Sequence, residues 1–164
     1  YYESVQSAWA ADLIDGVTAT KFKPDDTLTV AQAIKLAAAL YQMEHEGEVT
    51  LRNGSETWYD SYVSYAVANG IIEKDYASYT AAHMNAAITR AEFVHIFHGA
   101  ESTYKAINQV ADDAIPDVNT GDAFASDIYG FRREGHVPSG KQHQAQRGCD
   151  HPAQNVRSRC KSFY

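Results

Sequence analysis

A repeated pair of helical patterns constrains this chain more than any other feature. The segment TLTVAQAIKLAAALYQ at 27–42 aligns with AITRAEFVHIFHGA at 87–100, and SAWAADLIDG at 7–16 aligns with SYAVANGIIEK at 64–74. A third copy begins with IPDVNTGDAFASDIYGFRREG at 115–135. The offset between copies is roughly 55–65 residues, and a repeat of this length predicts supersecondary units that share one core.

Each unit is predicted to fold as helix, loop, helix. In the second unit the first helix is indicated by apolar residues at 3–4 spacing: Tyr59, Tyr62, Val63, Ala66 and Val67. Ser55 or Thr57 can cap its start, and Gly70 suits the left-handed residue after its end.

The second helix of each unit begins with a capping signal. Thr89 and Glu92 have the spacing of a capping box, in which each side chain binds the other residue's backbone N–H. Thr29 and Gln32 repeat that spacing in the first unit. The residues expected to face the core are Phe93, Ile96 and Phe97 in the second unit's helix and Ala33, Ile34, Ala37 and Leu40 in the first unit's helix.

The fold class predicted from these patterns is all-α, built of helix–loop–helix repeats, with an irregular or disordered C-terminal tail. We place a first unit at residues 1–43, which lacks part of its N-terminus, a second at 57–104, and the start of a third at 115–134. The polar segment 44–56, with its Asn-Gly turn signal, links the first two units. The chain begins with Tyr1 and not Met, so we interpret it as a fragment or a processed product.

Charge is distributed unevenly along the chain, whose net charge is −7. Through Gly130 there are 7 Lys and Arg against 19 Asp and Glu, whereas from Phe131 onward there are 7 against 2. The acidic part argues against a nucleic-acid partner. The sequence contains no apolar run of about 18 residues, so membrane insertion is not expected.

The tail at 135–164 departs from the repeat. It contains no Leu, Ile, Thr or Met, and it holds both cysteines, Cys149 and Cys160. Reading the codons of His143–Val156 one base later permits Ile-Arg-Arg-Ser-Glu-Ala-Ala-Thr-Ile-Leu, which is the style of helix missing from the third unit. We therefore interpret the tail as off-frame, the alternative being a real basic tail that binds an acidic polymer. Sequencing the encoding DNA separates the two.

Residue patterns for catalysis or cofactor binding are weak. His95 and His98 are three apart on a helix, but no third metal ligand is suggested, so no metal or other cofactor is expected. The segment DVNTGD at 117–122 lacks the Gly and distal Glu of an EF-hand loop and is interpreted as a turn before the next helix. No nucleophile–base set stands out, so we do not expect an enzyme.

The repeated motifs resemble the S-layer homology module. The resemblance is carried by FKPDDTLTVAQAIKLAAAL, WYDSYVSYAVANGII, ITRAEFVHIF and IPDVNTGDAFASDIYGF, and it covers roughly residues 1–134. It implies three modules packed as a pseudo-threefold helical domain. It also implies that the chain tethers an extracellular protein to the bacterial cell wall or S-layer by binding a secondary cell-wall polysaccharide, often anionic, or a peptidoglycan-linked polymer.

Arg90 and Thr89 are the leading candidates for ligand binding. Arg90 stands at the first helical position, where free backbone N–H groups and the helix dipole favour an anion, and its guanidinium can bind a carboxylate with two hydrogen bonds. The resemblance likewise implies that this arginine contacts the ligand. The alternative is a solvated surface arginine. Val30 replaces it in the first unit, which predicts a weakened site there.

Three further residues have both a binding interpretation and a structural one. Trp58 can stack on a sugar ring or anchor the start of its helix. Asp60 can bind a sugar hydroxyl or favour the helix dipole. Gly70 can contact the ligand or serve as a C-cap. Two other functions remain open: a piece of a larger surface enzyme, such as a wall or glycan hydrolase, in which this segment is only the anchor, and a purely structural helical interaction domain.

Overall fold

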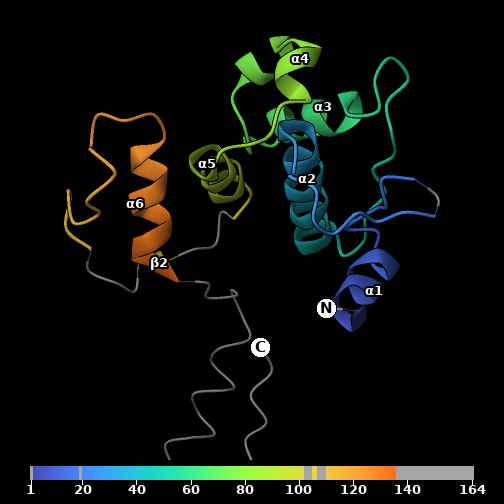
Figure 1. The fold of residues 1–164 in the computed structure, drawn as a ribbon, viewed down its shortest axis with the longest axis horizontal. Coiled ribbons are helices and arrows are strands. Elements are labelled where there is room, and N and C mark those ends of the chain that lie inside the picture. Colours follow the sequence, from blue (N-terminus) through green and yellow to red (C-terminus); the bar gives the residue numbers. More distant parts are fainter. Residues whose placement is uncertain (1, 19, 102–104, 107–109, 136–164) are drawn as a thin grey trace, which may run out of the picture.

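The computed structural model describes residues 2–18, 20–101, 105–106 and 110–135, and they form a helical fold, as predicted (Figure 1). Two two-residue strands pair antiparallel, with Lys105 opposite Gly135. The elements are α1 (Tyr2–Ala10), α2 (Val30–Glu46), α3 (Asp60–Ala68), the 3-10 helix η1 (Lys74–Ser78), α4 (Ala81–Met84), α5 (Arg90–Ala100), β1 (Lys105–Ala106), α6 (Ala125–Arg133) and β2 (Glu134–Gly135).

The helix bounds agree with the repeat alignment. Helices α1, α3 and α6 each have nine residues, and they begin at Tyr2, Asp60 and Ala125. Helices α2 and α5 both begin directly after a threonine N-cap, Thr29 or Thr89. The pseudo-threefold arrangement and the unit boundaries stay predictions. The tail that was predicted to be off-frame and disordered lies outside the described residues, apart from Gly135 in β2.

Helix α2 occupies the centre of the described fold. It packs against α3 and α5, and α5 packs in turn against α6 (Figure 1). The alanines of α2 have almost no exposed surface and let its neighbours approach closely, and Ile34, Ile71, Met84, Ile96 and Val30 are the largest side chains that are fully buried. Burying each large apolar side chain contributes about 1.5–3 kcal/mol. Leu40, Phe93 and Phe97, predicted in the core, are only half-buried.

The two predicted capping boxes form to different extents. In α2, Thr29 Oγ1 accepts from the Gln32 N–H (3.3 Å) and Gln32 Oε1 accepts from the Thr29 N–H (3.0 Å). In α5, Thr89 Oγ1 accepts from the Glu92 N–H (3.1 Å), but the Glu92 carboxylate turns inward. It accepts from the buried Tyr76 hydroxyl (3.3 Å), which has to find an acceptor in the core. The second half of this predicted box is therefore wrong.

The start of α3 reverses the predicted capping roles. Neither Ser55 nor Thr57 caps the helix with its side chain; instead the Asp60 carboxylate accepts from the Thr57 N–H (2.7 Å) and from the Thr57 hydroxyl. At the other end, the Ile71 N–H donates to Ala66 O (2.8 Å) in a Schellman motif, with Gly70 at φ +71°. The C-cap interpretation of Gly70 is thus confirmed.

Candidate functional site

A groove of about 620 Å³ runs between the α1–α2 connection and the first half of α2. We call it the α2 groove. It combines apolar and aromatic side chains with amides, hydroxyls and charges, which is the mixed lining of sites that bind small polar ligands. Its lining residues are Leu13, Ile14, Asp15, Gly16, Val17, Phe22, Lys23, Pro24, Asp26, Thr27, Leu28, Thr29, Gln32, Lys35, Leu36, Asn53, Trp58 and Asn85.

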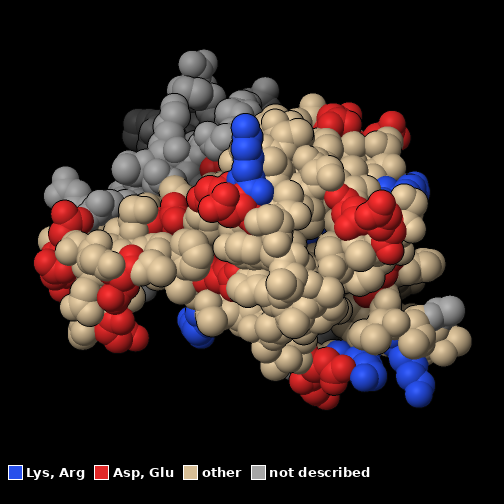
Figure 2. All heavy atoms as spheres, turned by 90° about the horizontal axis from the view of Figure 1, so that it is seen from above, with Lys and Arg blue, Asp and Glu red and all other residues tan. Residues whose placement is uncertain are grey.

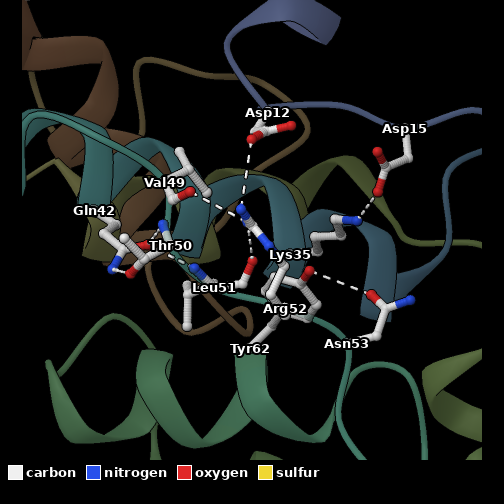
Figure 3. A network of polar contacts seen from close by, with 10 residues as sticks. All are labelled: Asp12, Asp15, Lys35, Gln42, Val49, Thr50, Leu51, Arg52, Asn53 and Tyr62. Carbon is white, nitrogen blue, oxygen red and sulfur yellow. Dashed lines mark hydrogen bonds and ion pairs between the residues drawn. The ribbon is translucent and has the colours of Figure 1, made fainter.

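One wall of the groove is the connection from α1 to α2. Asp15 in this connection forms an ion pair with Lys35 of α2, as Figure 3 shows. The Lys35 side chain is only 14% exposed, and its Nζ lies 5.1 Å from the centre of the Tyr62 ring of α3. A cation over a phenol ring and beside a carboxylate is held in place, so Lys35 ties the connection to both helices.

The segment before α3 also contributes to the lining, with Asn53 and Trp58. Asn53 accepts a hydrogen bond from the Tyr62 hydroxyl (3.3 Å; Figure 3), which orients its amide at the groove. Trp58 is half-buried and packs edge-on against Tyr59, with ring centroids 5.4 Å apart. Phe22, from the first wall, is 40% exposed. Two aromatic side chains thus line the groove.

The buried side chain of Gln42 holds the loop that leads to Asn53. Its Oε1 accepts from the Thr50 N–H (2.9 Å) and the Leu51 N–H (3.1 Å), and its Nε2 donates to Thr50 Oγ1 (2.7 Å) and to Glu46 (2.8 Å). Arg52 donates to Leu51 O (2.8 Å) and lies 3.8 Å from Asp12, as Figure 3 shows. These contacts fix the loop, although it contains no helix or strand.

A short backbone bridge joins the starts of α2 and α5. The Val30 N–H donates to Ala86 O (3.2 Å), and the Ile88 N–H donates to Leu28 O (3.0 Å). The two copies of the capping motif therefore lie side by side, and Asn85, just before the bridge, lines the α2 groove. Val30 itself is 1% exposed, so the residue at this position of the first unit belongs to the core.

The predicted binding residues are spread over this region. Trp58 lines the groove, whereas Arg90 and Thr89 do not; they stand at the start of α5, beyond the bridge. Arg90 is exposed, and its guanidinium has no ion pair or hydrogen bond with any residue of the described ranges. Thr89 is the N-cap. The Arg90 cation is therefore accessible to an external anion.

Asp60 and Gly70 have local structural roles. Both carboxylate oxygens of Asp60 accept from Thr57, and the hydroxyl first and the N–H second lower the pKa of Asp60. The positive φ at position 70 favours glycine. Space is not the reason, because a Cβ there would meet no atom within 4 Å. Neither residue lines the groove.

Sequence reasoning missed most of the groove. Lys35, Asn53, Asn85 and Phe22 were not candidates, because they come from four separate segments that only tertiary packing brings together. Each has an ordinary local context, and no spacing rule relates them. The segment FKPDDTLT, which contains Phe22, was the available signal.

One face of the molecule carries more acidic than basic side chains (Figure 2). Figure 2 shows acidic side chains in several separate groups around a largely uncharged centre, with few basic ones. Among the described residues, no group of three or more His, Cys, Asp or Glu is placed to hold a metal ion. No helix within these ranges is both long and apolar enough to traverse a bilayer.

Comparisons with known proteins relate the chain to one kind of surface protein. No protein-family model matches it. No solved structure matches it either. Over 131 residues, 77% of this chain, it is 30% identical to the Surface-layer 125 kDa protein of Lysinibacillus sphaericus. The chain spans 11% of that protein's length, and is thus similar to one part of a surface-layer protein.

Proposed function

We propose that this chain anchors an extracellular protein non-covalently to the bacterial cell wall by binding an anionic secondary cell-wall polysaccharide. The observation that carries the proposal is the α2 groove, whose lining includes the aromatic side chains of Trp58 and Phe22 and the amides of Asn53 and Asn85. The similarity to a surface-layer protein supports a place at the cell surface.

The lining of the groove fits sugar chemistry. A pyranose ring has apolar C–H faces that pack on aromatic rings, and its hydroxyls both donate and accept, as amides do. Trp58 is half-buried, so its exposed surface is already held in one orientation and little conformational entropy would be lost on binding. The groove would receive one or two sugar residues of the polymer.

Arg90 supplies the charge for an anionic group. The Lys35 cation in the groove is already paired with Asp15, whereas no described residue pairs with Arg90. Arg90 also begins a helix, where the dipole adds to the attraction for a carboxylate or phosphate. Asn85, which lines the groove, and Arg90 stand on either side of the bridge segment 86–88, so a polymer long enough to pass the bridge would contact both.

We propose a binding module and not an enzyme. The two carboxylates that line the groove are each paired with a lysine: Asp15 with Lys35, and Asp26 with Lys23 at 3.0 Å. Paired, solvent-facing carboxylates stabilise local structure and are poorly suited to proton transfer.

The test is binding to purified cell walls, with and without extraction of the secondary polymer. We expect the protein to sediment with intact walls and to stay in solution with extracted walls. Equal binding to both would overturn the assignment of the polymer. Calorimetry with extracted polymer then assigns the residues.

Arg90→Ala should weaken binding of the extracted polymer by about 1.5–3 kcal/mol, the range for a hydrogen bond to a charged group. Lys74→Ala, which removes an exposed cation from η1, is the matched control and should bind as the parent does. Thr89→Ala should instead lower the free energy of unfolding by about 1 kcal/mol through loss of the N-cap. If folded Arg90→Ala binds like the parent, Arg90 is not part of the site.

A further inference from the structure

A cluster of two histidines and two carboxylates connects α5 to its neighbours, away from the α2 groove. His95 Nδ1 lies 2.7 Å from Asp127 Oδ2 of α6, and His95 Nε2 lies 3.0 Å from Glu73 Oε2, just before η1. His98 Nδ1 lies 3.0 Å from the other oxygen of Asp127. The His95 side chain is only 10% exposed, so water competes little for its ring nitrogens.

The two contacts of His95 match only one hydrogen-bonding form of its ring. A neutral imidazole has one N–H donor and one acceptor nitrogen, whereas an ionised carboxylate only accepts. With a carboxylate on each nitrogen, only the imidazolium donates to both. In the neutral form one nitrogen lone pair faces a carboxylate oxygen, and that contact becomes repulsive. The cluster then holds two negative charges with none opposing them at His95.

Helix α6 packs on α5, and the Asp127 contacts of this cluster are part of that packing, beside the buried Ala125 and Tyr129 of α6. The apolar cluster around α2 contains residues from α2, α3, η1, α4 and α5, but among the described residues none from α6. Phe124, at the start of α6, stacks on the His95 ring with centroids 4.4 Å apart. It does so with φ +62°, a left-handed backbone conformation that is unfavourable for a residue other than glycine. Docking of α6 has to outweigh that strain.

Other titratable groups lie near His95. Tyr76 of η1 stacks on it at 6.2 Å, and burial raises the pKa of Tyr76, so this phenol stays neutral at physiological pH. Glu92, on α5, accepts from Tyr76 and lies 3.4 Å from His83. Helix α2 packs on α5, and among the described residues it contributes no charged partner to His95.

We propose that the α5–α6 contact is a pH-sensitive joint, closed while the His95 imidazolium bridges Glu73 and Asp127 and loosened when His95 loses its proton. The closed joint binds a proton that the open one releases, so falling pH strengthens the contact and rising pH weakens it. This stabilisation ends at strongly acidic pH, where the carboxylates take up protons. The α2 groove and its neighbours lie outside the joint, and they keep their structure in both states.

The experiment is an NMR titration of the full chain between about pH 5 and about pH 8, the range in which histidines change charge. The imidazole signals of His95 and His98 and the amide signal of Gly130, in α6, should move in one common transition. Signals from α2 and α3 should stay in place and show that the core remains folded. An α6 signal that does not change with pH would overturn the proposal.

Three variants test the assignment. His95→Gln keeps one donor and one acceptor but cannot gain a proton, so the α6 transition should disappear. His45→Gln changes an exposed histidine on α2 and should leave the transition as it is in the parent. Glu73→Gln removes a 62% exposed carboxylate at little risk to folding and should move the transition to lower pH. An unchanged transition in both His95→Gln and Glu73→Gln would exclude this cluster as the switch.

Discussion

At the level of single residues, Gly99 in α5 has the least room for a side chain among the described glycines. A Cβ at Gly99 would lie 2.1 Å from Ile71 O and 2.9 Å from its carbonyl carbon, both of them backbone atoms. The Schellman motif at the end of α3 places Ile71 there, so the glycine sets the distance between α3 and α5. The repeat alignment gave no reason to single it out.

Gly99→Ala should destabilise the protein. Alanine gains up to about 1 kcal/mol of helix propensity over glycine. Displacing two packed backbone segments costs about 1–3 kcal/mol or more, so the clash outweighs the gain. Gly121→Ala is the control, because a Cβ there meets no atom within 4 Å and the residue is exposed. Urea unfolding measures both. A Gly99→Ala variant as stable as Gly121→Ala would contradict the described packing.

At the level of elements, a phenol–carboxylate contact joins the end of α2 to α3. The Tyr65 hydroxyl donates to Glu46 Oε1 (2.7 Å). Burial and this hydrogen bond raise the pKa of Tyr65 to about 12, whereas a free tyrosine has a pKa of about 10. The folded state therefore holds this proton more tightly. The resulting stability is fully present below about pH 10 and is lost as the pH rises toward about 12.

Tyr65→Phe should remove this part of the pH dependence. The free energy of unfolding of the parent should fall more steeply between about pH 10 and about pH 12 than that of Tyr65→Phe. Tyr2→Phe, at a residue that is 79% exposed, should behave like the parent. Chemical unfolding at a series of pH values makes the comparison. Parallel pH profiles for the parent and Tyr65→Phe would show that the Glu46 contact does not persist in solution.

Helix starts separate what the sequence can predict from what it cannot. Thr29 and Thr89 were predicted as N-caps because a hydroxyl three residues before a polar side chain is a local signal. The inward turn of Glu92 was not predictable, because its partner Tyr76 comes from η1 and its burial depends on tertiary packing. The start of α3 at Asp60 was missed for a similar reason, since Thr57 carries both a donor and an acceptor and only the structure shows which is used.

At the level of the whole molecule, the same distinction applies to the site. The helical class follows from apolar periodicity, which is local information. Of the predicted site residues, Trp58 alone lines the α2 groove. The groove depends on the path of the α1–α2 connection and on the bridge between Thr29 and Ala87, and neither leaves a pattern in the sequence.

The net charge of −7 predicts how salt acts on the proposed binding. A negative protein and an anionic polymer repel each other at distances up to about 30 Å at 0.01 M salt and about 8 Å at 0.15 M. The association rate constant should therefore rise with salt, while dissociation quickens as the Arg90 contact is screened. Stopped-flow measurement at both salt concentrations tests this. A neutralised form of the polymer is the control, and an association rate that falls with salt would argue for a wider basic surface than Arg90 provides.

The buried amide of Gln42 has a consequence for how fast backbone hydrogens exchange with solvent. The Thr50 and Leu51 N–H groups lie in a loop, yet both donate to Gln42 Oε1, and Gln42 is 3% exposed. In deuterated water these two amides should exchange as slowly as helix amides, and the amide of the neighbouring, exposed Glu48 should exchange quickly. Gln42→Leu should make all three fast. The wall of the groove that carries Asn53 would then have lost its support, while helix α2 beneath it kept its own slow amides.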